Sequence, residues 1–375
     1  MARVHLSILL FSFVSCKVGS APYNPDIQFS QAWWDTIILR CALQQSSECI
    51  IPAPAAIYFP EIVSDTGQSI CYDGTTNVIC PDVLFPSQDA DFVNVPSMRS
   101  YTGPVINSVY TNDYTTLDNV RGLVWKSCPE GLSGSTCGVG ATTAVSFSVA
   151  SGLCSNLNAQ NSGAGYAGIT SWRLPSIYEL ARMSNVETVS GVDSMNFPGS
   201  PTVITFFSST PYAPNPTTTG WYVQIVNPGF YNELNYGTGP FSVRCVSGPS
   251  LFNHSLINNG NGTVTDNRTG LVWQDGAGGG NNTWQGALAT CSALGLAGLS
   301  WRLPNAHELH SIVDYSGPNP AIDTGVFPGT TAQYYWTSST NRFNLSFAWA
   351  VFFASGLMGG NGKGANLDFR CVSGP

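Results

Sequence analysis

Charge is scarce in this 375-residue chain, because Asp, Glu, Lys and Arg together supply only 10% of its residues. The chain has 14 basic and 22 acidic side chains, which gives a formal net charge of −8. The basic residues are scattered, so the electrostatic footprint of a nucleic-acid-binding protein is missing. The same shortage leaves few candidates for general acid–base catalysis.

Long apolar runs are also missing, since none reaches the roughly 18 residues that a membrane-spanning helix requires. Glycine is abundant instead, with 39 residues, as are proline, with 24, and aromatic side chains, at 12%. This composition is typical of a turn-rich extracellular protein rather than of a helical cytosolic enzyme. The length allows two or three domains, each with its own core.

Familiar catalytic motifs are absent as well: the sequence contains no GxSxG, no P-loop and no Cys–His pair. The cysteines are better explained as disulfide partners than as nucleophiles. We therefore predict that the protein is not an enzyme, has no catalytic residue and needs no cofactor.

The N-terminus has the features of an export signal. A basic start precedes the apolar run LSILLFSFV, and Cys16 follows closely. This pattern predicts a signal peptide over residues 1–16, and FVSC resembles a bacterial lipobox, whose cysteine is lipidated. The alternative is cleavage near VGSA, before Ala21 or Pro22, which would give a secreted protein. We predict an outer-membrane or cell-surface lipoprotein, alternatively a secreted protein, that contacts the membrane only through lipid on Cys16.

The cysteine count agrees with export. Of 11 cysteines, setting Cys16 aside leaves an even number, which suits an oxidising compartment. Six of them lie close together in sequence, and proximity alone predicts the pairs Cys41–Cys49, Cys71–Cys80 and Cys128–Cys137. The others are far apart, and their pairing depends on an internal repeat.

That repeat is the strongest signal in the chain. SWRLPSIYELARM begins at Ser171, and SWRLPNAHELHSI begins at Ser300. RGLVW and TGLVW precede them, whereas FPG, SST and RCVSGP follow in both copies. Two copies of this length indicate two domains rather than a short-period solenoid. We predict a signal peptide at 1–16, an N-terminal segment at 17–58, a first domain at 59–249 and a second domain at 251–375.

The repeated phrase predicts a strand-to-helix corner. Ser176 and Glu179, three residues apart, have the spacing of a capping box, and Asn305 and Glu308 take the same places in the second copy. Each copy also has an upstream helix that carries one cysteine and a last strand that carries another. The pairs Cys154–Cys245 and Cys291–Cys371 follow, and the chain-entropy model gives each about 4–5 kcal/mol.

Several segments of the second copy resemble a known family. They are NGNGTVTDNRTGLVWQ, WQGALATCSALGLAGLSWRLPNAHELHSIVDYS, PAIDTGVFPG, YWTSST and FRCVSGP. Together they resemble the Lcl C-terminal domain family, named after a Legionella collagen-like adhesin, and the first copy is similar but more divergent. The segment DTGQSICYDGTTNVICPD before the first copy is similar to the lead-in often found in front of this domain.

The resemblance implies an α+β protein with two tandem C-type-lectin-like domains. Each would pack two helices on a twisted antiparallel sheet, with a helix-to-last-strand disulfide. It also implies a bacterial envelope or secreted protein that acts in adhesion or ligand display. The chain is acidic and has no Gly-X-Y tract, which argues against sulfated-glycan binding and collagen-driven trimerisation.

In such a fold, ligands usually meet irregular segments before the last strand, held out by a rigid scaffold. We expect these segments at Asn227–Pro240 in the first copy, and at Asn341–Asn344 and Gly356–Asp368 in the second. The candidate ligand-binding residues are Tyr231, Asn232, Asn235, Tyr236, Asn341, Arg342, Asn344, Lys363 and Asn366. Aromatic faces beside amides suit sugars or peptide surfaces, and the alternative is a turn with exposed tyrosines.

Two further segments could suggest a metal. His307, His310 and Asp314 share a helical face and are legitimate zinc ligands, but their first-copy counterparts include no ligand set, so we predict a solvated helix face. Asn258–Asn267 is rich in oxygen, but its single carboxylate suits a tight turn better than a calcium loop. We therefore predict no metal.

The function predicted from these observations is non-enzymatic, adhesin-like binding of an extracellular glycan or protein at the bacterial cell surface. One alternative is a structural or assembly subunit of the cell envelope. Another is a degenerate enzyme of the formylglycine-generating-enzyme-like fold, for which the reactive cysteines or copper ligands cannot be located.

Overall fold

The computed structural model describes residues 63–188, 191–199, 203–226, 230–250, 254–276, 280–317 and 319–374, with the side chains at 203–204, 225–226 and 230–235 left out. All of them belong to one compact unit, Phe59–Pro375. The predicted signal peptide, Cys16 and the Cys41–Cys49 pair lie outside the described residues. Within the described part, no helix is both long and apolar enough to cross a membrane.

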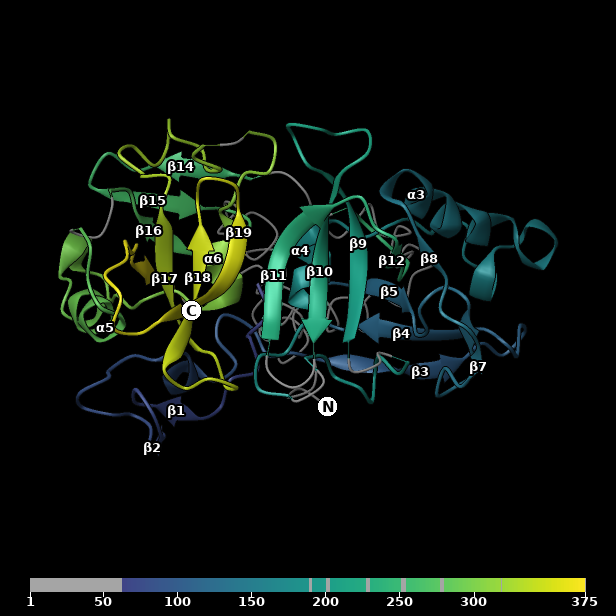
Figure 1. Ribbon diagram of the computed structural model, residues 1–375, viewed down its shortest axis with the longest axis horizontal. Coiled ribbons are helices and arrows are strands. Elements are labelled where there is room, and N and C mark those ends of the chain that lie inside the picture. The colour runs from purple at the N-terminus through teal and green to yellow at the C-terminus, as the bar shows by residue number, and fades with distance from the viewer. Residues whose placement is uncertain are drawn as a thin grey trace, which may run out of the picture. The chain divides into compact units, whose positions relative to one another are not determined.

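The chain forms a mixed α+β protein of mostly antiparallel strands and few helices (Figure 1). A lead-in, defined here as residues 63–99, contains β1 (Cys71–Tyr72), β2 (Asn77–Val78) and η1 (Asp89–Phe92). The first copy contains β3 (Tyr101–Ile106), β4 (Tyr114–Asp118), β5 (Leu123–Lys126), β6 (Leu132–Ser133), β7 (Val139–Gly140), β8 (Ala144–Val145), α3 (Phe147–Asn156), η2 (Leu157–Ala159), η3 (Asn161–Gly163), η4 (Tyr166–Gly168), α4 (Ile177–Arg182), β9 (Val203–Pro211), β10 (Gly220–Val226), β11 (Phe230–Gly237), β12 (Phe241–Ser242) and β13 (Val246–Ser247). The second copy contains β14 (Leu256–Asn258), β15 (Thr263–Asp266), β16 (Val272–Gln274), α5 (Trp284–Ser292), η5 (Leu296–Gly298), α6 (Ala306–Ser311), β17 (Tyr334–Thr340), β18 (Phe347–Phe352), β19 (Leu357–Gly362) and β20 (Val372–Ser373).

Each copy closes a small sheet with its own repeated segments. The GLVW motif forms β5 in the first copy and β16 in the second, and the residues after the last cysteine form β13 and β20. These segments pair antiparallel, Val246 with Trp125 and Val372 with Trp273. The turn predicted at Asn258–Asn267 is confirmed, because β14 and β15 pair antiparallel across it.

The two copies share one larger sheet. Its strand order is β17-β18-β19-β11-β10-β9-β12-β8, so the long strands of both copies lie in one row. Antiparallel pairing of Leu234 with Met358 joins β11 to β19, the adjacent strands at which the two copies meet (Figure 1). The tandem copies are therefore fused by main-chain pairing rather than tethered as independent domains.

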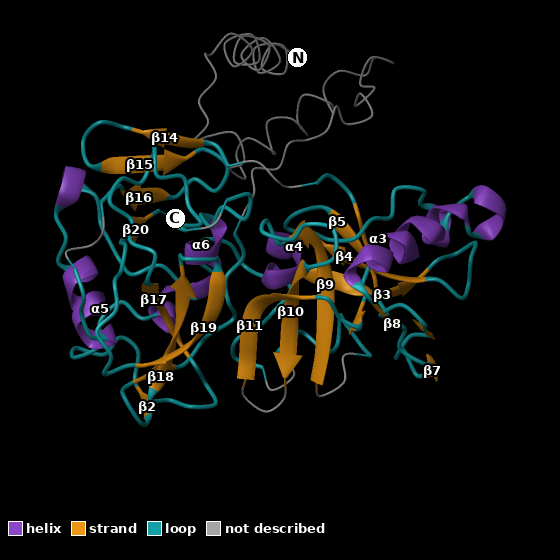
Figure 2. Ribbon diagram, turned by 45° about the horizontal axis from the view of Figure 1, so that its top comes forward, coloured by secondary structure: helices purple, strands orange, loops and turns teal. Residues whose placement is uncertain are grey.

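The main core also crosses from one copy to the other. Figure 2 shows α4 beside β9–β11 and α6 beside β17–β19, and these two short helices contact each other. In this core the ring of Trp221, from the first copy, lies 4.6 Å from that of Tyr315, from the second. Separate smaller cores contain α3 in the first copy and α5 in the second.

Both predicted capping boxes are confirmed. The Ser176 hydroxyl accepts from the Glu179 amide, and the Glu179 carboxylate accepts from the Ser176 amide, at 3.3 and 2.7 Å. Asn305 and Glu308 make the same two bonds. An arginine three residues before each cap donates to the same glutamate through both terminal guanidinium nitrogens, at 2.6 Å each for Arg302 and at 2.8 and 2.6 Å for Arg173. The repeated phrase thus encodes one corner, held by an ion pair and a cap.

Four disulfides are present, and they join the pairs that the sequence predicts within the described residues. Cys154–Cys245 and Cys291–Cys371 each link the first helix of a copy to the segment before its last strand. Cys71–Cys80 closes the lead-in hairpin, and Cys128–Cys137 closes a loop of the first copy.

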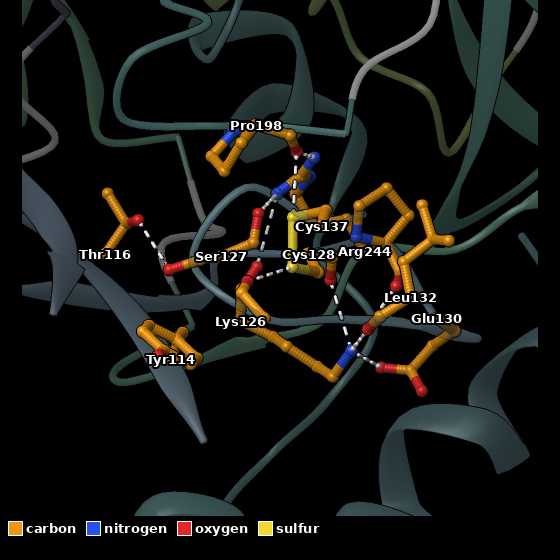
Figure 3. Close-up of a disulfide and its surroundings, with 12 residues drawn as sticks. Tyr114, Thr116, Lys126, Ser127, Cys128, Glu130, Leu132, Cys137, Pro198 and Arg244 are labelled. Carbon is orange, nitrogen blue, oxygen red and sulfur yellow. Dashed lines mark hydrogen bonds and ion pairs between the residues drawn. A yellow bond between two sulfur atoms is a disulfide. The ribbon is translucent and has the colours of Figure 1, made fainter. Parts of the chain in front are cut away.

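The arginine before the last cysteine of each copy also has a structural role. Figure 3 shows the buried Arg244 donating to the carbonyl oxygens of Ser127 and Pro198 beside the Cys128–Cys137 disulfide. In the second copy, Arg370 donates to the successive carbonyls of Gln274 and Asp275 at the end of β16, at 2.5 Å each. The arginine of the repeated Arg–Cys dipeptide therefore holds, by hydrogen bonds to main-chain carbonyls, the end of the GLVW strand and the segment after it.

Candidate functional site

The predicted solvated histidine face on α6 is wrong. His307 and His310 are each only 1% exposed, because α6 lies between the shared sheet and the helix α4 of the other copy. The His307 ring contacts the Ser64 carbonyl at 3.0 Å through Nδ1 and the Ser184 hydroxyl at 3.4 Å through Nε2. Burial lowers the pKa of His307 to about 3, so its imidazole is neutral.

His310 is held in the same interface. Its Nε2 lies 2.7 Å from the Tyr315 hydroxyl, and its ring lies 5.1 Å from that of Tyr178. Burial lowers the pKa of His310 well below the ordinary histidine value. The carboxylate of Asp314 accepts instead from the amide of Ser316 at 2.8 Å. The three residues therefore serve as packing and turn groups rather than converging on one point.

Among the described residues, one group of three ligand-type atoms gathers closely: those of Cys71, Cys80 and Asp91. Both sulfurs belong to a disulfide, so neither is the thiolate that a metal would require.

The lead-in precedes the first copy in sequence but also packs on the second. The side-chain amide of Gln68 makes two hydrogen bonds with the main chain of Thr340, at 2.8 and 2.9 Å. The buried Asp89 accepts from the hydroxyls of Ser339 and Thr66, and burial raises the pKa of this carboxyl to about 8. The lead-in therefore contacts both copies, because Arg99 also donates to the carbonyls of Met183 and Ser184 in the first copy.

Two candidate ligand-binding residues of the second copy contact other parts of the chain, Lys363 the lead-in and Arg342 the first copy. The Lys363 ammonium lies 3.9 Å from the centre of the Trp284 ring and donates to the Asp73 carbonyl at 2.7 Å. Burial lowers the pKa of Lys363 to about 7. Arg342 donates to the carbonyl of Glu187 at 2.6 Å and pairs with its carboxylate at 3.3 Å. Both cations therefore already have partners within the protein, although the Arg342 side chain is 34% exposed.

The other second-copy candidates differ in exposure. Asn341 is 4% exposed, and its side chain accepts from the amide of Phe343. Asn344 and Asn366 are exposed, so they remain accessible at the surface.

Of the three segments expected to be irregular, two contain a strand, whereas residues 341–344 lie outside the strands as expected. Residues 230–237 form β11 and residues 357–362 form β19, because each strand pairs with its neighbour and the two pair with each other. The side chains of Tyr231, Asn232 and Asn235 lie outside the described residues. Of the first-copy candidates, Tyr236 is described.

Tyr236 takes part in an aromatic pair at the end of the first-copy strands. Its ring stacks on that of Tyr212 with centroids 3.6 Å apart and planes inclined by 6°. Both residues are half-buried, and the buried Trp221 packs against Tyr236 edge-on at 5.4 Å. The pair therefore presents partly exposed aromatic surface from a rigid base.

The second copy lacks this pair. The Thr210 hydroxyl accepts from the first amide of α4, and the Ser339 hydroxyl accepts from the first amide of α6. Thr210 therefore corresponds to Ser339 in the structure, one residue away from the alignment that the repeated SST would give. Tyr212 then corresponds to Asn341. On the neighbouring strands, Tyr236 lies opposite Trp221, and Gly360 lies opposite Trp349. Gly360 is therefore the second-copy residue that corresponds to Tyr236. The aromatic pair is specific to the first copy.

Sequence reasoning missed Tyr212, although one signal was present. In the printed sequence, SSTPY stands in the first copy where SSTNR stands in the second, so an aromatic residue follows one repeated strand only. Its partner could not be identified, because the pairing of Trp221 with Tyr236 sets which ring lies beside it.

Comparison with known proteins gives one match. The Lcl C-terminal domain matches residues 114–247 and 262–373, which together cover more than half of the chain. No curated protein and no solved structure matches. The lead-in lies outside both matched segments, and the family is not a known enzyme family. The chain belongs to the Lcl C-terminal domain family, of which it carries two tandem copies, and this membership suggests a bacterial surface protein.

Proposed function

We propose that this protein is a non-enzymatic, adhesin-like component of the bacterial cell surface, in which lectin-like domains bind an extracellular glycan or protein. The observation that carries the proposal is the stacked pair Tyr212–Tyr236, which is half-buried and present in the first copy only. A binding role for the first copy follows, with the second copy acting as its scaffold.

The aromatic pair has the properties of a contact surface for sugars or protein side chains. Aromatic rings offer large contact areas, and tyrosine adds a polar hydroxyl for orientation. A side-chain hydrogen bond with Tyr236 raises the pKa of Tyr212, so the two phenols are coupled as well as stacked. Because Trp221 and the paired strands fix the rings, a ligand would meet a surface that is already ordered.

The strongly shifted titratable groups favour binding over catalysis. Asp89, His307 and Lys363 each contact structural partners in separate places, rather than facing one another around a shared substrate position. The disulfides support export to an oxidising compartment. A lipid anchor on Cys16 belongs to the same proposal, and that residue lies outside the described part of the chain.

The test is a ligand screen with matched variants. We would measure binding of the full chain to a glycan array and to immobilised extracellular-matrix proteins. The double variant Tyr212→Ala/Tyr236→Ala should weaken binding of any hit at least tenfold, which corresponds to about 1.4 kcal/mol. Tyr110→Ala changes a half-buried tyrosine outside the pair and should leave binding intact.

Equal binding by the double variant would show that the ligand contacts another surface. Absence of any ligand, together with co-purification of envelope proteins from the native membrane, would replace the adhesin proposal with an assembly role.

A further inference from the structure

The lead-in covers a face of the second copy, whereas the matching face of the first copy is more exposed and no described segment covers it in the same way. This corner face combines the repeated strand-to-helix corner with the end of the first long strand and the start of the disulfide-bearing helix. In the second copy it comprises Trp284, Arg302, Asn305, Ser339 and Thr340, and in the first copy Phe147, Arg173, Ser176, Thr210 and Pro211.

In the second copy, residues of the lead-in make hydrogen bonds and a ring contact with the groups of this face. Asp89 accepts from the Ser339 hydroxyl, and the Phe92 ring lies 5.0 Å from the Arg302 guanidinium. The main-chain carbonyl of Val95 accepts from the side-chain amide of Asn305 at 3.3 Å. A short helical turn, η1, that carries a carboxyl group at its start and an aromatic ring at its end thus matches the corner.

The aromatic position at the start of the disulfide-bearing helix is covered in the same way. The Phe85 ring lies 5.9 Å from that of Trp284, and Gln285 donates to the Leu84 carbonyl at 2.9 Å. Trp284 is fully buried as a result, although it lies in the first turn of a surface helix.

The matching groups of the first copy are more exposed. The Arg173 side chain is 26% exposed, against 6% for Arg302, although both arginines pair with the capping glutamate at 2.6 Å. Phe147 is half-buried where Trp284 is fully buried, and Thr210 is half-buried where Ser339 is fully buried. The capping box and the arginine–glutamate pair are alike in both copies, and Arg173 donates in addition to the carbonyls of Gly248 and Pro249. The second-copy corner differs in being covered by the lead-in.

A hydrogen-bonding difference supports this. The Thr210 hydroxyl accepts from the Ile177 amide at 3.0 Å, and among the described residues no acceptor lies opposite its own proton. In the second copy the equivalent proton of Ser339 goes to Asp89. A carboxyl oxygen is therefore the group that the first-copy corner lacks.

One position sets the two faces apart. Pro211 stands where the second copy has Thr340, whose amide donates to Gln68. Proline has no amide proton, so the first-copy face cannot bind a glutamine side chain in that two-bond manner. The carboxyl and ring contacts remain available.

We propose that the corner face of the first copy binds a segment of a partner protein, in which a short helical turn places a carboxyl group on Thr210 and an aromatic ring over Arg173. The second copy provides the precedent, because its own corner is filled in this way by the lead-in. This interaction goes beyond the surface ligand proposed above and uses different side chains from the tyrosine pair.

The test uses a fluorescent peptide of residues 63–99, with its Cys71–Cys80 disulfide closed, titrated with the full chain. We expect saturable binding, weakened at least tenfold when the peptide carries Asp89→Leu. A second variant lies in the protein: Ser148→Trp, at the exposed α3 position that matches Gln285, should also weaken binding at least tenfold. Gln160→Trp, at an exposed position beyond α3, is the matched control and should bind normally.

Amide hydrogen exchange locates the peptide. It should protect the main chain at Ser208–Thr210 and leave Ser338–Thr340 unchanged. Absence of binding, equal binding of the Asp89→Leu peptide, or protection confined to the second copy would each overturn the proposal. A dimer of the chain that shields Ser208–Thr210 without peptide would assign the face to a second copy of the chain, which also overturns it.

Discussion

The hydroxyl of Tyr178, in the first copy, donates to the main-chain carbonyl of Val313, in the second. The equivalent position of the second copy holds His307, which contacts Ser184, the counterpart of Val313, at 3.4 Å. Matching positions on α4 and α6 thus make reciprocal contacts, as in a symmetric dimer interface formed within one chain. The duplication has been preserved as a paired structure rather than as separate domains.

The Tyr178 contact can be tested with Tyr178→Phe. Tyr178 is 2% exposed, so removing the hydroxyl deprives a buried carbonyl of its donor. We expect the free energy of unfolding to fall by about 1–3 kcal/mol, measured by urea denaturation. Tyr110→Phe, at a half-buried tyrosine outside this interface, should change it by less than about 0.5 kcal/mol. Equal losses of unfolding free energy in the two variants would show that the Tyr178 hydrogen bond does not stabilise the interface.

The interface histidines predict acid sensitivity. The pKa of His307 is lowered to about 3 in the folded protein from an ordinary value of 6.5, so between these values the unfolded chain binds a proton that the folded chain refuses. Stability is therefore lost as the pH falls from about 6.5 towards 3, by about 1.4 kcal/mol per pH unit. In His307→Gln this slope should be shallower by that amount. An unchanged slope would contradict the buried neutral imidazole.

Asp89 predicts the opposite dependence. Burial raises its pKa to about 8 from an ordinary 3.8, so between these values the folded protein holds a proton that the unfolded chain releases. Its contribution to stability is therefore lost as the pH rises towards 8. Asp89→Asn stays neutral at every pH. Its free energy of unfolding, relative to that of the natural protein, should therefore rise by about 1.4 kcal/mol for each pH unit from 5 to 8. A pH-independent difference in urea denaturation would contradict the protonated carboxyl.

Lys363 should control how firmly the lead-in is held. Lys363→Met keeps the apolar stem but removes the ammonium from Trp284 and from the Asp73 carbonyl. We expect amide exchange in the β1–β2 hairpin to accelerate at least tenfold, while β10 keeps its protection. Lys363→Arg retains the charge and should have a smaller effect. Unchanged exchange in the hairpin would show that other contacts hold it.

The disulfides should differ in how much each contributes to the free energy of unfolding. Cys291–Cys371 spans 80 residues and Cys128–Cys137 spans 9. In the chain-entropy model, replacing both cysteines by serine should cost about 4–5 kcal/mol for the long loop and about 3 kcal/mol for the short one. Thermal unfolding of the two double-serine variants measures this order, and a reversed order would mean that native contacts outweigh loop length.

The local parts of the fold could be predicted from the sequence because their signals are local. Glu179 three residues after Ser176 defines a capping box, and a helix cysteine and a last-strand cysteine recur in both copies. The shared sheet could not be predicted, because β19 reads LMGGNG, which looks like a loop. Its pairing with β11 is set by the partner strand rather than by its own residues.

The error at the histidines has a similar cause. A polar face on a short helix predicts solvent on that face, but every residue of α6 is buried. The covering elements, α4 and the lead-in, come from far away in the chain. The internal contacts of two binding candidates were hidden for the same reason, since Arg342 and Lys363 meet partners that adjacent sequence does not reveal.

The central claim is that the two copies form one body, because the corner face of the first copy, the tyrosine pair and the interface histidines all depend on it. Native-state hydrogen exchange in low denaturant measures this directly for β10 of the first copy and β18 of the second. We predict that their most protected amides open with the same free energy and the same denaturant slope. If one strand exchanges at a clearly lower free energy while the other stays protected, the copies unfold separately and the claim is wrong.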